Sequence, residues 1–455
     1  MSGTNGNDSV NIQDSTLAAA GDVERERAQL VRPAYRNVVL AMVVIGFALN
    51  FMDRQILSIL MQPIKQELHL SDTALGFLSG LAFAIFYATL GLPVSRIADR
   101  GSRRVVMAIS MGLWSLATAT SGLARSFLQL FGSRIGVGVG EAGFTPSGLA
   151  MIADYFPRAV RGTALGILNI GPMVGSMAGL LIGGWVAHLW GWRAAFMIAG
   201  LPGVIFALLF WLIVREPWRG MADGAPREKH PQPSAWDGTR QLMRSATYVY
   251  LVAGTGMSAF ALYGISLWMP SFLARSFGFS LPTIGITLGP VIGIVGGAGM
   301  IAGGYIMDRL RRRDERWAMW MPAIAALLSI PALLIALTLA NAYAAIGTYA
   351  LAYFLSVLWV APAFAVIQAI VHPAMRVTAT AGQLFVTNLV GLGLGPQVVG
   401  LLSDLFAPAG TNSLRYAMMI CALAPLFPAV FYMLAARSMK TSGIHADLAS
   451  AAMDN

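Results

Sequence analysis

Apolar segments about 20 residues long recur along almost the whole chain of 455 residues. A helix of roughly 20 apolar residues is long enough to span the hydrocarbon core of a bilayer. Charged residues make up 11% of the chain, against about a quarter in an ordinary soluble domain. These are too few to cover a folded surface in water. The pattern therefore predicts an all-α membrane protein rather than a soluble enzyme.

Twelve of these segments are predicted to span the membrane, and a polar stretch separates them into two sets of six. They lie near residues 36–60, 74–98, 105–124, 126–152, 163–188, 193–214, 247–273, 282–306, 317–338, 341–370, 378–404 and 414–436. The predicted domains are a disordered cytoplasmic tail at 1–35, a six-helix bundle at 36–214, a cytoplasmic linker at 215–245, a second six-helix bundle at 246–437 and a cytoplasmic tail at 438–455.

The distribution of basic residues predicts the orientation of the spans. Of the 31 Lys and Arg residues, 24 fall on the side of the termini, five lie in the opposite loops, and Arg54 and Arg134 lie within spans. Because cytoplasmic loops of membrane proteins are enriched in Lys and Arg, both termini are predicted to be cytoplasmic. This topology accounts for the net charge of +10, so a nucleic-acid partner is not expected.

The two halves of the sequence repeat each other. Ser71 with Gly76 and Ser280 with Gly285 recur 209 residues apart, which is also the spacing of Asp99 and Asp308. Such repetition predicts two pseudo-equivalent bundles that rock around a central site. Arginines that follow each Asp can clamp neighbouring helices by charge-assisted hydrogen bonds in one conformation and release them in the other. The predicted cytoplasmic gate consists of Asp99, Arg100, Arg103, Arg104, Asp308 and Arg309.

Four ionisable side chains lie well inside the predicted spans: Asp53, Arg54, Arg134 and Glu141. Each is costly in hydrocarbon, so together they indicate a cavity or an ion path. At a rise of about 1.5 Å per residue, Asp53 and Arg134 are expected at a similar depth, and Glu141 about 10 Å closer to the cytoplasm.

A static pair of buried salt bridges is the alternative explanation of these charges. Desolvation makes such pairs poor stabilisers. When the proline of the first span is aligned with that of the seventh, Phe260 and Ala261 fall at the positions of Asp53 and Arg54. The architecture therefore does not need charges there, which favours a functional role.

Proton coupling is the role that these residue types support. Burial and a neighbouring arginine have opposite effects on the proton affinity of a carboxylate, so a conformational change that moves an arginine can drive proton uptake or release. Asp53 and Glu141 are therefore the predicted proton carriers. Arg54 and Arg134 are predicted to be their charge partners or to bind an anionic head group, since a guanidinium binds phosphate through two hydrogen bonds.

Other residues carry weaker signals. Tyr87, Tyr263, Trp268 and Asn388 are candidates for lining a cavity, although packing or interfacial anchoring would also explain them. The five histidines form no ligand cluster and Cys421 is the single cysteine, so neither a metal nor another cofactor is expected. The sequence has no nucleophile–base arrangement and no GxxxxGK[ST] loop, which disfavours an enzyme and a nucleotide-driven pump. A channel is harder to exclude, but the duplicated gate favours a carrier.

Four motifs resemble those of a known family: NFMDR at 50–54, RIGVGVGEA at 134–142, IADYF at 152–156 and VREPWRG at 214–220. Over nearly its whole length the chain resembles the major facilitator superfamily, and more narrowly the bacterial-type homologues of its Spinster branch of lipid transporters. That family normally has Gly at the position of Ser95, whereas Gly304 keeps the pattern in the second half.

The resemblance implies the major facilitator fold, a monomer, and a multi-pass location in the cell (inner) membrane. It also implies proton-driven export or flipping of a lysophospholipid-like or sphingosine-phosphate-like lipid, with lipid, protons and the bilayer as partners. One alternative is an organic-anion:proton symporter, since the related anion-transporter branch also carries an Asp-Arg pair in its first span. A multidrug exporter and a transport-inactive sensor remain further alternatives.

Overall fold

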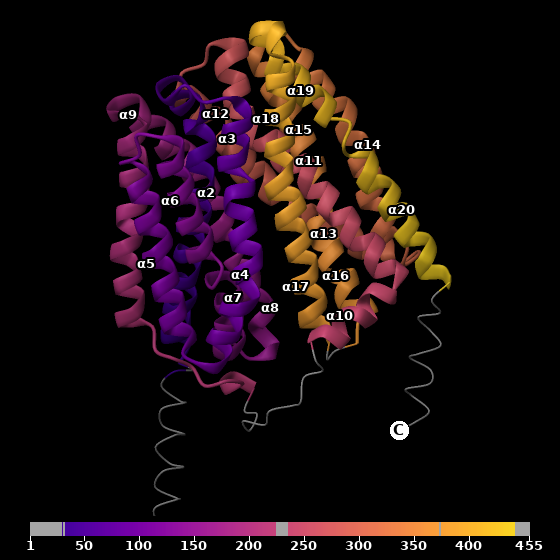
Figure 1. Cartoon of the computed structure of the whole chain (residues 1–455). Helices are drawn as coiled ribbons and strands as arrows, with labels where there is room; N and C mark the ends of the chain where they lie inside the picture. Colours follow the sequence, from indigo (N-terminus) through magenta and orange to yellow (C-terminus); the bar gives the residue numbers. More distant parts are fainter. Residues whose placement is uncertain (1–29, 31, 224–234, 373–374, 442–455) are drawn as a thin grey trace, which may run out of the picture.

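The computed structural model describes residues 30, 32–223, 235–372 and 375–441 of the chain. These residues form helices and contain no β-strand. The helices run in opposite directions side by side, and the described ends of the chain lie on the same side of the molecule (Figure 1). We call this the termini side and the opposite one the far side.

The first half contains spans one to six, several of which are built from two helices. Its elements are α2 (Pro33–Leu68), α3 (Asp72–Ser79), α4 (Leu81–Arg100), α5 (Arg103–Ser121), α6 (Phe127–Glu141), α7 (Phe144–Tyr155), α8 (Arg158–Leu168) and α9 (Ile170–Ile213). Spans five and six are continuous in α9 and are divided by a kink at Gly191, whose φ of 83° favours glycine.

A connecting segment and the second half follow. The segment includes the short helices η1 (Met221–Asp223) and α10 (Ala235–Arg244). The second half comprises α11 (Ala246–Phe277), α12 (Leu281–Pro290), η2 (Val291–Val295), α13 (Gly296–Arg311), α14 (Trp317–Thr338), α15 (Ala342–Val357), α16 (Val360–Ile370), α17 (Arg376–Val386), η4 (Thr387–Leu394), α18 (Gly395–Leu405), η5 (Ala407–Asn412), α19 (Ser413–Cys421) and α20 (Leu426–Thr441). The segments η2 and η4 are π-helical.

These helices confirm the predicted all-α fold of twelve spans. Among the described residues, nine helical stretches are long and apolar enough to cross a membrane, and one of them, Arg158–Ile213, holds two spans. The third span is the more polar α5, and the fourth is broken between α6 and α7, so neither is among the nine. Helix α2 begins three residues inside the predicted amino-terminal tail, and helix α20 ends four residues inside the predicted carboxyl-terminal tail. Residues 1–29, 31, 224–234 and 442–455 of the predicted tails and linker lie outside the described part.

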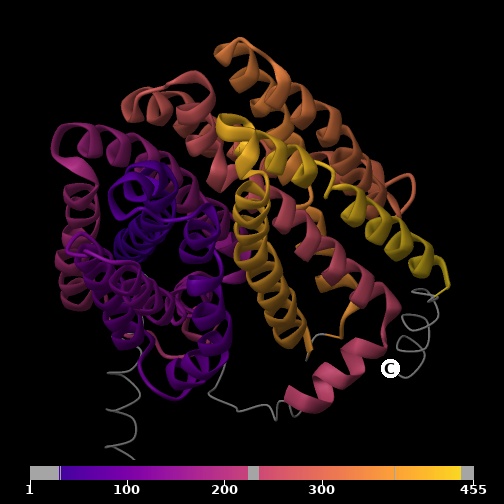
Figure 2. The ribbon, with the colours of Figure 1, turned by 45° about the horizontal axis from the view of Figure 1, so that its top comes forward.

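The two halves form separate groups of helices that meet along one interface. Figure 2 shows the indigo-to-magenta helices of the first half on one side and the orange-to-yellow helices of the second half on the other. On the far side α3 packs against α18, and α9 packs against α12. The central site must therefore lie along this interface.

The repeated Ser–Gly pairs explain why the far side packs closely. Ser71 and Ser280 cap the N-termini of α3 and α12, each by accepting a hydrogen bond from a backbone N–H three residues later. A Cβ atom added at Gly76 would lie 2.6 Å from the carbonyl oxygen of Pro396, and one at Gly285 would lie 2.5 Å from that of Leu180. Both glycines thus let backbones of opposite halves approach closely.

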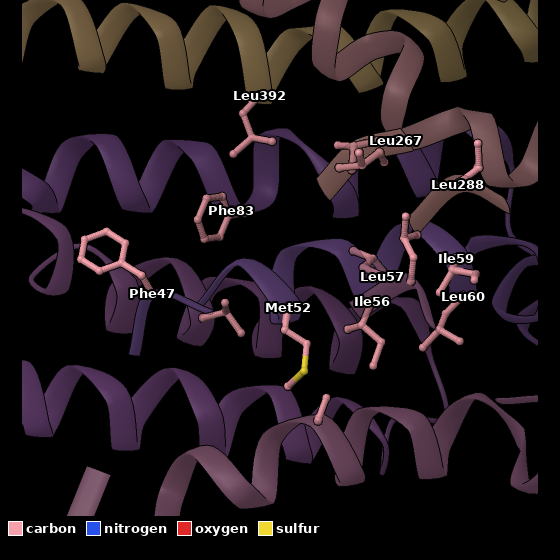
Figure 3. Packing of buried hydrophobic residues seen from close by; sticks show 14 of the residues in the cluster. Phe47, Met52, Ile56, Leu57, Ile59, Leu60, Phe83, Leu267, Leu288 and Leu392 are labelled. Carbon is pink, nitrogen blue, oxygen red and sulfur yellow. The ribbon is translucent and has the colours of Figure 1, made fainter. Parts of the chain in front are cut away.

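Buried apolar side chains extend this contact across the interface. Ile56, Ile59 and Leu60 of α2 belong to the same cluster as Leu267 and Leu288 of the second half (Figure 3). A second cluster of buried residues lies within α10 and the second half. The far part of the interface is therefore a packed core.

Candidate functional site

Arg54 and Glu141 form a buried ion pair between α2 and α6. Nε and Nη2 of Arg54 lie 2.7 and 2.6 Å from the same oxygen, Oε2 of Glu141. The rings of Phe51, Phe83 and Tyr87 lie 5.0, 4.9 and 4.9 Å from the guanidinium carbon, which is favourable cation–π geometry. The side chain of Glu141 is fully buried, while 14% of the Arg54 side chain is exposed.

Asp53 and Arg134 lie beside this pair, and both are buried. Oδ2 of Asp53 accepts a hydrogen bond from Oγ1 of Thr118 at 3.1 Å. Nη2 of Arg134 donates to Oγ of Ser121 at 3.3 Å. Asp53 interacts electrostatically with Glu141 and with Arg134. The structure therefore brings the four predicted residues together, and we call Asp53, Arg54, Arg134 and Glu141 the charged cluster.

The hydrogen bonding of the charged cluster is incomplete. Oδ1 of Asp53, Oε1 of Glu141 and Nε of Arg134 are buried without a hydrogen bond of good geometry to any described residue. An unsatisfied buried polar atom costs about 1–3 kcal/mol. Protonation of a carboxylate converts one of its acceptors into a donor. The cluster therefore has acceptor and donor atoms left for further hydrogen bonds.

A cavity of about 260 Å³ lies between the two halves beside the charged cluster. Arg54 and Arg134 line it from the first half, whereas Asp53 and Glu141 are not among its lining residues. Tyr263 and Tyr353 line it from the second half, and most of the remaining wall is apolar. Two guanidinium groups on a largely apolar wall suit an anionic group that is attached to an apolar body.

A second cavity of about 450 Å³ lies closer to the termini side. It is lined by residues of α4 and α7 from the first half and of α16, α17 and η4 from the second. Leu384 lines both cavities, so the two are adjacent. Leu149 and Phe385, which face each other across the halves, are 43% and 38% exposed. The interface is thus hollow toward the termini and packed on the far side.

Three of the four weaker candidates line these cavities. Tyr263 lines the first cavity, and Tyr87 and Asn388 line the second. Trp268 lines neither of them, because its fully buried indole donates a hydrogen bond from Nε1 to the carbonyl oxygen of Pro396 at 2.9 Å. Trp268 therefore holds α11 against α18 instead of facing the cavity.

Arg103 and Arg104 of the predicted cytoplasmic gate contact residues of their own half. Arg103 forms an ion pair with Asp154 at the end of α7. Nε of Arg104 donates to the carbonyl oxygen of Trp211 at 2.8 Å, and its guanidinium carbon lies 5.3 Å from the Trp211 ring. These contacts tie α5 to α7 and α9.

The other predicted gate residues lie open or outside the described part. Asp308 and Arg309 are exposed, and Nη1 of Arg309 reaches the hydroxyl of Tyr305 at 3.5 Å. The side chains of Asp99 and Arg100 are not among those described. The gate prediction therefore concerns contacts that would form when the termini side closes.

On the far side, a network around Asp72 joins the halves, and sequence reasoning missed it. Both carboxylate oxygens of Asp72 accept from Arg275 of α11, at 2.6 and 2.7 Å. Lys65 donates to Oδ1 at 2.5 Å and Ser403 of α18 to Oδ2 at 2.6 Å. Asp404 accepts from the first two backbone N–H groups of α3, at 3.0 and 2.7 Å. We call this the far-side network.

The missed network left only a faint signal in the sequence. Asp72 and Arg275 are separated by 203 residues, and Asp72 and Asp404 by more than 330. Charges near helix ends are ordinary, so Arg275 and Lys65 served only to establish topology. The signal for this network was the low number of charged residues in the far-side loops. Where charges are few, each of them is expected to have a specific partner.

Comparisons with known proteins agree with this fold. Residues 43–396 match the model of the family described as Major Facilitator Superfamily. The chain is 36% identical to an MFS-type efflux pump of Mycolicibacterium smegmatis, over 92% of this chain and 97% of that protein. It is 28% identical to human protein spinster homolog 1, over 87% of this chain and 80% of that protein.

Solved structures give the same result. A bacterial homologue of the human lysosomal transporter Spinster, in an inward-facing and unoccupied conformation, superposes with a TM-score of 0.81 at 30% identity. The match covers 90% of this chain and 98% of that structure. The twelve-span fold, the cavity between the halves and these matches together show that the chain belongs to the major facilitator superfamily, as a Spinster-type transporter.

Proposed function

We propose that the protein is a proton-coupled secondary transporter that moves an amphipathic lipid of lysophospholipid or sphingosine-phosphate type across the membrane by alternating access. Both termini would be cytoplasmic. The observation that carries the proposal is the arrangement of the charged cluster, in which two buried carboxylates lie behind two arginines that line the cavity between the halves.

The unequal pairing of the carboxylates supports proton coupling. Glu141 is paired with Arg54, whereas Asp53 forms no salt bridge of good geometry with a described residue. A substrate phosphate that binds Arg54 would compete with Glu141 for it, and the released carboxylate would gain proton affinity. Substrate binding and protonation of Glu141 would then promote each other, which couples the proton to the substrate.

The shape of the interface supports a lipid substrate. The second cavity is lined mainly by apolar side chains and lies between α4 and α7 of one half and α16 and α17 of the other. An acyl chain could rest there while a phosphate reaches the arginines of the first cavity. With the far side packed, both cavities would be loaded from the cytoplasmic side.

The test is lipid flux in liposomes under an imposed pH gradient. Wild-type protein is expected to accelerate lysolipid movement, and the rate should depend on the gradient. Asp53→Asn and Glu141→Gln should each remove that dependence. Ser147→Ala provides a control, because Ser147 is buried in α7 and lines neither cavity. A pH response that survives in both variants would remove the carboxylates from the mechanism.

A multidrug exporter is the second candidate, and the 36% identity to the mycobacterial efflux pump favours it. An amphipathic drug without a positive charge could occupy the same apolar walls. Cells that express the protein should then resist such compounds. Reconstituted protein should also transport those compounds faster than it transports lysolipids.

A further inference from the structure

Gln383 and Thr387 lie together on the second-half wall of the central cavity. They are four residues apart in α17 and at the start of η4, so they share one helix face. The π-helical turn begins at Thr387, and such turns occur frequently at functional sites. Neither residue stands out in the sequence as ionisable or as part of a repeat.

Both side chains have polar atoms without partners. Gln383 is 1% exposed, and its Oε1 has no hydrogen bond to any described residue. The same holds for Oγ1 of Thr387. Elsewhere in the spans, threonine hydroxyls donate to the carbonyl oxygen four residues earlier, as those of Thr287, Thr338 and Thr348 do. Thr387 thus departs from the local bonding that threonine ordinarily makes in these helices.

The opposite wall of the cavity is cationic. Arg54 and Arg134 line it from the first half, and no Asp or Glu is among its lining residues. A ligand whose phosphate binds these arginines therefore meets neutral acceptor oxygens on the other side. An amide oxygen accepts hydrogen bonds and cannot donate them. The Thr387 hydroxyl can accept as well as donate, so a ligand group that carries an N–H or O–H can satisfy both side chains.

We propose that Gln383 and Thr387 form a head-group subsite that selects amphiphiles with a hydrogen-bond donor next to their phosphate. This rests on the lipid transport proposed above and specifies its substrate class. A primary ammonium or a hydroxyl supplies the donor, whereas a quaternary ammonium has none. The head group occupies the cavity of about 260 Å³, and the acyl chain passes Leu384 into the adjoining cavity of about 450 Å³.

Two lysolipids that differ only at the nitrogen test the subsite. Full-length protein is reconstituted in liposomes of phosphatidylglycerol and phosphatidylcholine. Flux of lysophosphatidylethanolamine, which carries N–H donors, is compared with flux of lysophosphatidylcholine with the same acyl chain. Wild-type protein should favour the ethanolamine lipid. Gln383→Met and Thr387→Val should each lower kcat/KM for that lipid by about 10-fold, the loss expected for a hydrogen bond to a charged group. Both variants should leave the choline lipid within about twofold.

The control is Thr348→Val, which removes a hydroxyl from an exposed face of α15 outside both cavities and should change neither rate. Lysophosphatidylcholine flux shows in every variant that the protein is folded. Variants that reduce both lipids equally would overturn the subsite and leave lipid transport standing. Wild-type protein that moves neither lysolipid would overturn both proposals.

Discussion

Gly76 and Gly285 occupy corresponding places in the two halves, and each lets a helix meet the backbone of the opposite half. Asp53 and Arg54 have no such counterpart, because Phe260 and Ala261 stand in their places. Features that both halves share therefore serve the interface. Under the proposed function, features of one half alone serve binding and coupling: the first half supplies the arginines of the cavity, and the second half supplies Gln383 and Thr387.

The largest expected effect on stability comes from the charged cluster, which has no counterpart in the second half. Glu141→Gln leaves the Arg54 guanidinium buried without its anion, so the free energy of unfolding should fall by about 3–5 kcal/mol. The double variant Arg54→Leu/Glu141→Leu should recover most of that loss, because neither charge remains. Thermal unfolding in detergent measures both changes.

Transport by the double variant decides what the pair is for. Under the proposed coupling, it should be stable and yet show no pH-dependent flux. A stable double variant with the pH response of the wild type would mean that the pair is a static bridge. The contrast between the halves would then have no functional meaning.

A smaller effect is expected at the shared glycines, and it should be equal in both halves. Gly76→Ala and Gly285→Ala each place a Cβ within 2.6 Å of a backbone oxygen of the other half, and overpacking of this kind costs about 1–3 kcal/mol. Both should shift the population toward a state that is open on the far side. Distances between spin labels at the exposed Gln66 and Ala407 report that opening.

Gly347→Ala is the matched control for this pair, because nothing lies within 4 Å of a Cβ at that position. A response at Gly76 without one at Gly285 would break the equivalence of the halves.

Removing a charge from the far-side network should have a smaller effect on the opening of the far side. Asp72→Asn weakens the contacts to Arg275 and Lys65, which favours opening of the far side by about 1–2 kcal/mol. The exchange Asp72→Arg/Arg275→Asp should recover part of the closed population, since the partners lie in opposite halves. The same pair of labels provides the measurement. If the labels show a fully closed far side in Asp72→Asn, the free energy that favours closure comes from packing alone.

The smallest effect is expected at Asp308. Its side chain is exposed, so Asp308→Asn should change the free energy of unfolding by less than about 0.5 kcal/mol. If Asp308 belongs to a gate, the variant should still slow turnover, because the contact would be missing when the termini side closes. Turnover at the wild-type rate would remove Asp308 from the gate.

The fold and the members of the charged cluster could be predicted from the sequence because both depend on local chemistry. Hydrophobic length marks the spans, and a charge inside a span is conspicuous wherever it pairs. The pairing itself could not be predicted: depth alone gave no reason to choose Glu141 over Asp53 as the partner of Arg54. Gln383 and Thr387 were missed because uncharged polar residues in apolar helices usually bond to their own backbone, and only the structure shows that these do not.

The far-side closure joins main chain to main chain at Gly76 and Gly285, beside the far-side network. These contacts do not depend on which ligand the cavity holds. Residues that contact the substrate can accordingly be substituted without changing the contacts that close the far side. A scaffold of this kind offers one closing mechanism to many cargoes.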